Sequence, residues 1–136
     1  ALVRETGGLC VPETYLAVCR EVSDVLSSEY PERNALYQQR LEVIENDLKG
    51  LRDELLEKVR QAGMTSAKVL VSNYQADFVS WLGLEPIATF VGSDIETVAG
   101  IEHCIKKAEA QGVRFVIANK QEGTALAKAL AERLGA

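Results

Sequence analysis

The feature that most constrains the fold of this sequence is a change of apolar period near Gly63. Before Gly63, apolar residues recur at helical spacing over long stretches. After it, three short runs rich in β-branched residues, at 68–72, 86–91 and 113–118, alternate with amphipathic segments. This alternation is typical of right-handed βαβ units, which build a parallel sheet. Residues 64–136 are therefore predicted to form a small α/β lobe with the order β-α-β-α-β-α.

The segments between and after these runs have the apolar spacing of helices. We predict helices at 74–82, 94–111 and 122–134. Their expected inward-facing residues are Phe78, Val79, Trp81 and Leu82 in the first, Ile95, Val98, Ile101, Ile105 and Ala108 in the second, and Leu126, Ala127, Leu130 and Leu134 in the third.

The N-terminal part is predicted to be an irregular lead-in followed by two helices. The first helix covers residues 13–27, and Pro31 suits the first turn of the second, where its missing N–H has no helical partner. The second carries a narrow apolar seam over about 30 residues, so it is roughly 45 Å long, more than a small sheet needs. The seam consists of Tyr37, Leu41, Ile44, Leu48, Leu51, Leu55 and Val59. We therefore expect a helical part at 1–63 and the lobe at 64–136.

Composition narrows the classes of function. The chain has 136 residues and a formal charge of −5, so it has no electrostatic attraction to nucleic acid. No apolar stretch reaches the roughly 18 residues of a membrane-spanning helix. The three cysteines lack a CxxC spacing, which favours unpaired thiols, with a Cys10–Cys19 disulfide as the alternative.

Candidate ligand-binding residues follow the three predicted strands. In a parallel α/β sheet, ligands bind outside the carboxyl ends of the strands. The loops there contain Ser72, Gly92 and Lys120 together with six residues that we select as ligand-binding candidates. Two of the six, Asp94 and Asn73, have the alternative role of capping the helices that follow them. The six candidates are Asn73, Tyr74, Ser93, Asp94, Asn119 and Gln121.

The residues needed for catalysis are not grouped in this sequence. It contains neither GxxxxGK[ST] nor GxGxxG, and His103, the single histidine, lies within a predicted helix without a second ligand one turn away. We therefore predict no catalytic residues, no cofactor and no enzymatic activity. An enzyme that uses Asp94 and Asn119 as polar groups is the least favoured hypothesis.

The order of parts resembles the C-terminal half of the zinc/manganese-type periplasmic solute-binding proteins of ABC transporters. In that family a long rigid helix bridges two α/β lobes. The resemblance covers nearly the whole chain and rests on spacing and architecture. It is carried by the segments at 11–22, 30–37, 69–73, 83–85, 112–116 and 130–136, together with the seam helix.

The resemblance implies a divergent member, because the family's metal ligands are replaced. The region of Gly7 lacks the usual histidine, Asn73 stands at the position of a second histidine, and Asn119 stands at that of a carboxylate. An amide is a poor ligand for zinc or manganese, so no metal is expected at these positions. The resemblance implies an extracytoplasmic location, a small ligand and an ABC permease as partner. The alternative is a self-associating α/β domain that forms a homodimer through the long helix.

Overall fold

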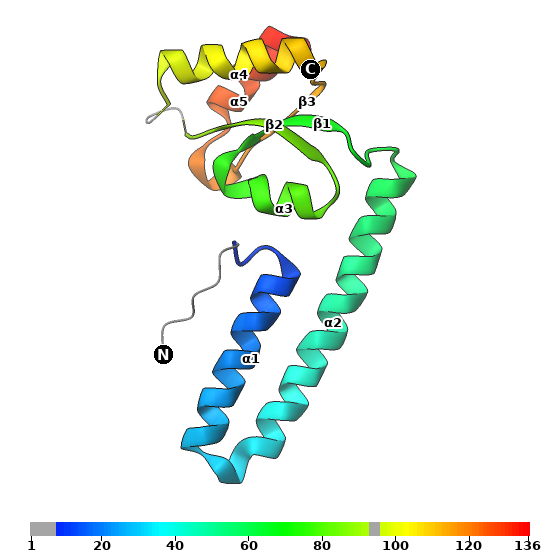
Figure 1. Ribbon diagram of the computed structural model, residues 1–136, viewed down its shortest axis with the longest axis vertical. Coiled ribbons are helices and arrows are strands. Elements are labelled where there is room, and N and C mark those ends of the chain that lie inside the picture. Colours follow the sequence, from blue (N-terminus) through cyan, green and yellow to red (C-terminus); the bar gives the residue numbers. More distant parts are fainter. Residues whose placement is uncertain (1–7, 93–95) are drawn as a thin grey trace. The chain divides into compact units, whose positions relative to one another are not determined.

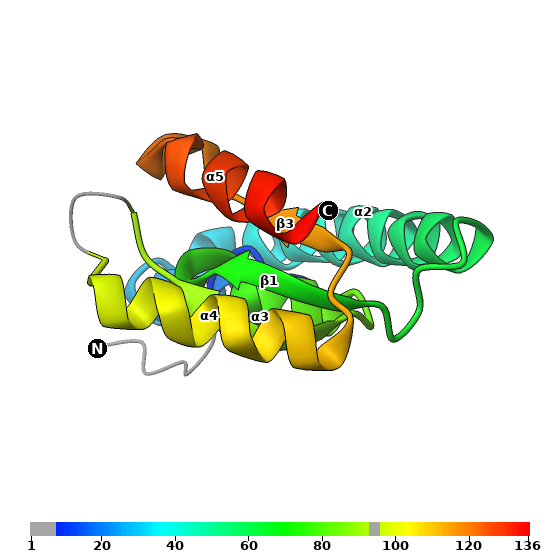
Figure 2. The same cartoon turned by 90° about the horizontal axis from the view of Figure 1, so that it is seen from above.

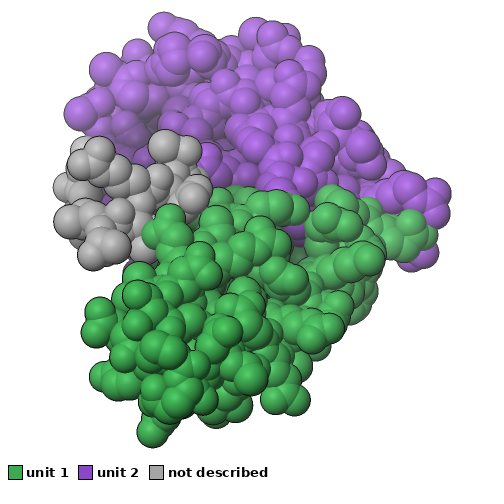
Figure 3. Space-filling view, turned by 60° about the horizontal axis from the view of Figure 1, so that its bottom comes forward, with its two compact units in different colours: residues 1–58 green, residues 59–136 purple. Residues whose placement is uncertain are grey.

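The computed structural model describes residues 8–92 and 96–136. The chain divides into two compact units, residues 1–58 and residues 59–136, which Figure 3 shows in different colours. The boundary falls within the last turn of a long helix. Each unit is described by itself below.

The first unit is a helical hairpin. It contains α1 (Pro12–Glu29), the short 3-10 helix η1 (Pro31–Arg33) and most of α2 (Asn34–Gln61) (Figure 1). As predicted, Pro31 lies in the first turn after the corner, where its missing N–H costs nothing. The hairpin buries few side chains: only Pro12 and Ser23 are buried in α1, and no residue of α2 is buried.

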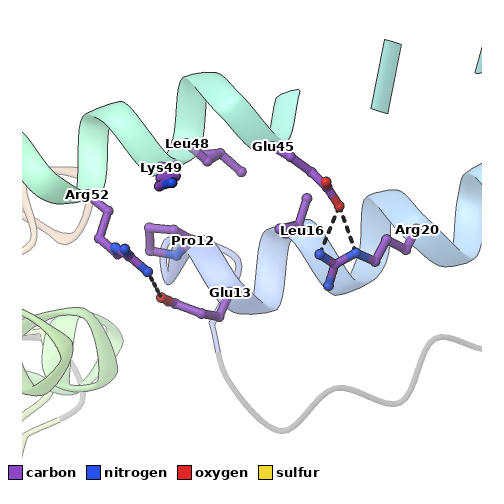
Figure 4. Close-up of a pocket in the computed structure, with 8 residues that line it drawn as sticks. All are labelled: Pro12, Glu13, Leu16, Arg20, Glu45, Leu48, Lys49 and Arg52. Atoms are coloured by element: carbon purple, nitrogen blue, oxygen red, sulfur yellow. Dashed lines mark hydrogen bonds and ion pairs between the residues drawn. The ribbon is translucent and has the colours of Figure 1, made fainter. Parts of the chain in front are cut away.

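Polar contacts join the two helices of this hairpin. The guanidinium of Arg20 donates from Nε and Nη2 to Glu45 Oε1 at 2.9 and 2.8 Å, and Arg52 approaches Glu13 at 4.0 Å (Figure 4). The amide of Gln38 donates to the buried Ser23 Oγ at 3.3 Å. These contacts fix which turn of α1 faces which turn of α2.

The second unit is built on a three-stranded parallel sheet. Its strands are β1 (Lys68–Ser72), β2 (Glu85–Phe90) and β3 (Phe115–Ile117), in the order β2-β1-β3. The register between β1 and β2 shifts at Val69/Leu70, opposite the segment that contains Pro86. Pro86 has no N–H to donate, and an edge strand tolerates it beside such an irregularity.

Helices cover both faces of this sheet (Figures 1 and 2). The helices α4 (Val98–Gln111) and α5 (Ala125–Leu134) lie on one face, and α3 (Ala76–Trp81) lies on the other. Alternate residues of β1 therefore enter different cores. One buried cluster consists of Leu70, Phe90, Cys104, Ala108, Val113, Ala127 and Leu130, and the other of Val69, Val71, Val79 and Leu84.

Three predicted helices start differently from the sequence-based boundaries. The helix expected at 94–111 begins only at Val98, because Thr97 is its cap and accepts a hydrogen bond from Gly100 N at 3.0 Å. Asp94 and Ile95 lie outside the described residues. The prediction that Val98 faces inward is wrong, since this first helical residue is 76% exposed.

The other two helices are each preceded by a 3-10 turn. The helix predicted at 74–82 is the turn η2 (Asn73–Gln75) followed by α3. The one predicted at 122–134 is η3 (Lys120–Glu122) followed by α5, and Gly123 lies between them with φ of 91°. This positive φ, which glycine adopts without a steric penalty, breaks the continuous helix that periodicity suggested.

The predicted class and element order are confirmed: long N-terminal helices precede a small parallel β-α-β-α-β-α sheet. The third strand is shorter than the apolar run at 113–118, and Val113, which precedes the strand, is also buried in the core. Within the described residues, no helix has the length and apolar character needed to cross a membrane.

Candidate functional site

The carboxyl ends of the three strands come together at one edge of the sheet. Ser72, the last residue of β1, is buried, and its Oγ donates a 2.7 Å hydrogen bond to Glu122 Oε2. Gly92, just after β2, lies so close that a Cβ built there would be 3.6 Å from Glu122 Cβ. Glu122 therefore connects the segments that follow all three strands.

Two of the predicted ligand-binding residues lie directly after the central strand. Asn73 begins η2 and is exposed, and Tyr74 beside it is 65% exposed. Neither makes a side-chain hydrogen bond with another described residue. The capping role considered for Asn73 is not observed, because Ser72 precedes η2 as its cap residue and makes no side-chain cap bond.

The other two described candidates lie after β3. Asn119 caps η3, because its Oδ1 accepts a 3.1 Å hydrogen bond from the backbone N–H of Gln121. This bond leaves the NH2 group of Asn119 for another partner. Ser93 and Asp94, the remaining candidates, lie outside the described residues.

An open depression brings part of this set together. It is lined by Gln75, Ala118, Asn119, Lys120 and Gln121. Of the predicted residues, Asn119 and Gln121 therefore share a surface, whereas Asn73 and Tyr74 do not line it. The lining combines three side-chain amides with the ammonium group of Lys120, and none of the five lining residues is acidic.

Sequence reasoning missed Glu122 and Gln75 and left Lys120 among the loop residues that were not selected. Glu122 was assigned to the start of a helix, and the interrupting Gly123 was the signal that could have corrected this. Gln75 was placed inside a predicted helix, although a polar residue three positions after a buried strand was an available signal.

A second carboxylate fastens the segment between β2 and α4. Glu96 Oε2 accepts a 2.8 Å hydrogen bond from the backbone N–H of Val91, and its side chain lies directly over Gly100. Burial raises the pKa of the Cys104 thiol, and the negative charge of Glu96 raises it further. Cys104 Sγ donates to the carbonyl oxygen of Thr89 at 3.3 Å, so the thiol has a structural role.

Metal ligands are not clustered in the part of the chain that the structure describes. Residues 8–92 and 96–136 contain no group of three or more His, Cys, Asp or Glu side chains placed to hold a metal ion. The cysteines are free thiols, exposed at Cys10, partly buried at Cys19 and buried at Cys104. The bridge considered between the first two is not present.

Comparison with known proteins identifies the family. The family model described as zinc-uptake complex component A, periplasmic (ZnuA) matches residues 11–136. No curated protein sequence matches the chain.

Solved structures show the same fold. A crystal structure of ZnuA has a TM-score of 0.74 at 20% identity, over 93% of this chain and 49% of that one. The manganese-bound periplasmic metal-binding protein of Candidatus Liberibacter asiaticus has a TM-score of 0.79 at 10% identity, over 95% of this chain and 48% of that one. The chain thus spans about half the length of these structures. Because the family model covers nearly all of the sequence, the chain belongs to the periplasmic zinc-uptake component A family.

Proposed function

We propose that this chain is the C-terminal half, bridging helix and lobe, of the solute-binding component of an ABC transporter. The single observation that carries the proposal is the family match over residues 11–136, and the α/β element order of the lobe is compatible with it. The protein would bind a small solute outside the cytoplasm, in the periplasm, and deliver it to an ABC permease. It would not be an enzyme. The alternative of a self-associating domain has no support from the comparisons.

In this proposal the solute contacts the carboxyl edge of the lobe. Asn73, Tyr74, Asn119 and Gln121 would act as hydrogen-bonding groups, with Ser93 and Asp94 as further candidates. Asn73, Tyr74 and Gln121 are exposed and Asn119 is half-buried, which is compatible with contact to a solute. The resemblance places Asn73 at the position of a metal-binding histidine of the family, so this edge would not hold zinc or manganese tightly.

Restoring a metal ligand tests this assignment. In the full-length protein, Asn73→His should raise the affinity for zinc by about tenfold or more, because imidazole is a far better zinc ligand than an amide. Isothermal titration with zinc chloride measures the change. Asn73→Gln is the matched control and should leave zinc binding as weak as in the wild type. An unchanged affinity in the histidine variant would show that position 73 does not face the binding site.

The natural solute can be sought directly. Native mass spectrometry of the full-length protein, purified without chelators, should detect a bound small molecule. Asn73→Ala combined with Gln121→Ala should lose that molecule while the far-ultraviolet circular dichroism stays unchanged. Retention of the molecule by this double variant would contradict the assignment of the edge.

A further inference from the structure

We infer that the solute recognised at this edge carries an oxyanion, such as a carboxylate or a phosphate group, which binds to the ammonium group of Lys120. The inference rests on the proposed function and specifies its class of ligand. It starts from the depression lined by Gln75, Asn119, Lys120 and Gln121 beside the backbone of Ala118.

The charge of this depression comes from Lys120. Lys120 is exposed and forms no ion pair with any residue in the described ranges. Its ammonium group has three donors and no acceptor, and it is free of ion pairs within the described residues, so it can bind an acceptor supplied by a ligand. A negatively charged oxygen makes the strongest such bond.

The amides around Lys120 provide further donors. Gln75 and Gln121 each carry a side-chain NH2 group, and the cap bond of Asn119 uses its oxygen and leaves its NH2 group available. A bound oxyanion has several acceptor sites and can accept from more than one of these groups. A metal cation would instead meet the positive charge of Lys120, and the described lining residues offer it no carboxylate.

The nearest acidic residue along the chain is already engaged. Glu122 accepts from the buried hydroxyl of Ser72 and lies against Gly92, and it does not line the depression. Its carboxylate is therefore directed toward the strand ends.

Chemical-shift mapping of the isotope-labelled full-length protein tests the inference. Sodium phosphate and sodium succinate, as separate titrants, distinguish the phosphate from the carboxylate as the preferred group, with sodium chloride at matched ionic strength as the reference. We expect saturable shifts in the side-chain amides of Gln75, Asn119 and Gln121 with at least one of the two anions. The affinity should fall as sodium chloride is added.

Variants of Lys120 test whether its ammonium group binds the anion. Lys120→Gln should weaken anion binding by about tenfold or more, whereas Lys120→Arg should keep it, because the charge is retained. Lys128→Gln removes an exposed charge from α5 and should have no effect. Equal binding by Lys120→Gln and the wild type, or no shifts beyond those with chloride, would overturn the inference.

A failure here can be separated from a failure of the proposed function. If zinc chloride or the co-purified molecule shifts these amides and the anions do not, the edge binds solutes and only the oxyanion inference is wrong. If no titrant shifts them, both the inference and the assignment of the edge are wrong.

Discussion

The two units of this chain use similar apolar residues with opposite results. The lobe buries Val69, Leu70 and Val71 completely, because helices cover both faces of its sheet. The hairpin leaves Val22 and Val43 about half exposed, at 48% and 55%, since two helices cannot enclose the apolar faces of each other. Layering, more than apolar content, therefore determines which part has a core.

The largest expected effect comes from a cavity in the lobe. Leu70→Ala removes a fully buried side chain between β1 and the helices α4 and α5, and should lower the free energy of unfolding by about 2–5 kcal/mol. Leu51→Ala in α2, where the side chain is 46% exposed, should cost less than about 1 kcal/mol. Urea denaturation followed by circular dichroism measures both. Equal losses would remove the distinction between the units.

A smaller effect is expected at the carboxyl edge of the sheet. Ser72→Ala deletes the buried donor to Glu122 and should destabilise the lobe by about 1–3 kcal/mol, because the carboxylate loses its partner. Ser80→Ala, at an exposed position of α3, is the matched control and should change little. Urea denaturation again provides the measurement. A neutral Ser72→Ala would mean that this hydrogen bond does not hold the strand ends together.

The cysteines differ between the two units in burial, and this difference predicts a pH dependence of stability and an order of reactivity. The pKa of the Cys104 thiol is higher in the folded state than in the unfolded state. The protonated thiol therefore favours folding, and this contribution to the free energy of unfolding is fully present below the ordinary thiol pKa, about 8.5. The contribution is lost as pH rises through the folded-state pKa. The exposed Cys10 should react first with a thiol reagent and Cys104 last. Mass spectrometry after timed alkylation gives the order. Early modification of Cys104 in the native protein would contradict its burial.

The smallest effect belongs to the hairpin's surface. The Arg20–Glu45 pair is exposed, so a double-mutant cycle with alanine should give a coupling of about 0.2–1 kcal/mol that decreases with added salt. Denaturation of the wild type, both single variants and the double variant supplies the four values. A coupling as large as the effect at Leu70 would show that ion pairs, in place of a core, hold this unit together.

Much of the fold could be predicted because the periodic signals were strong. The apolar run at β1 gave its residue limits without error, and Pro31 marked the corner between the two helices. The limits of α4 and α5 were harder to predict. Thr97 caps α4, whereas the sequence also offers Asp94 as a cap candidate. The positive φ of Gly123 interrupts a pattern whose apolar spacing continues through it.

The site was predicted less completely than the fold. The carboxyl edge followed from the parallel sheet, and two of the residues predicted there, Asn119 and Gln121, line the same depression. Glu122 was missed because its role depends on a long-range bond to Ser72, 50 positions away, which no local pattern records. The lining role of Gln75 likewise depends on how the β1 and β3 ends meet in space.

Hydrogen–deuterium exchange of the full-length protein, with and without its co-purified solute, tests the central claim most directly. If the lobe's carboxyl edge contacts the solute, backbone exchange at 72–75 and 118–122 should slow on binding. Exchange at 106–111 should stay the same, because this end of α4 lies beside the start of β1, where Lys68 Nζ donates to Gln111 Oε1. Slower exchange only outside these two segments would contradict the claim that this edge binds the solute.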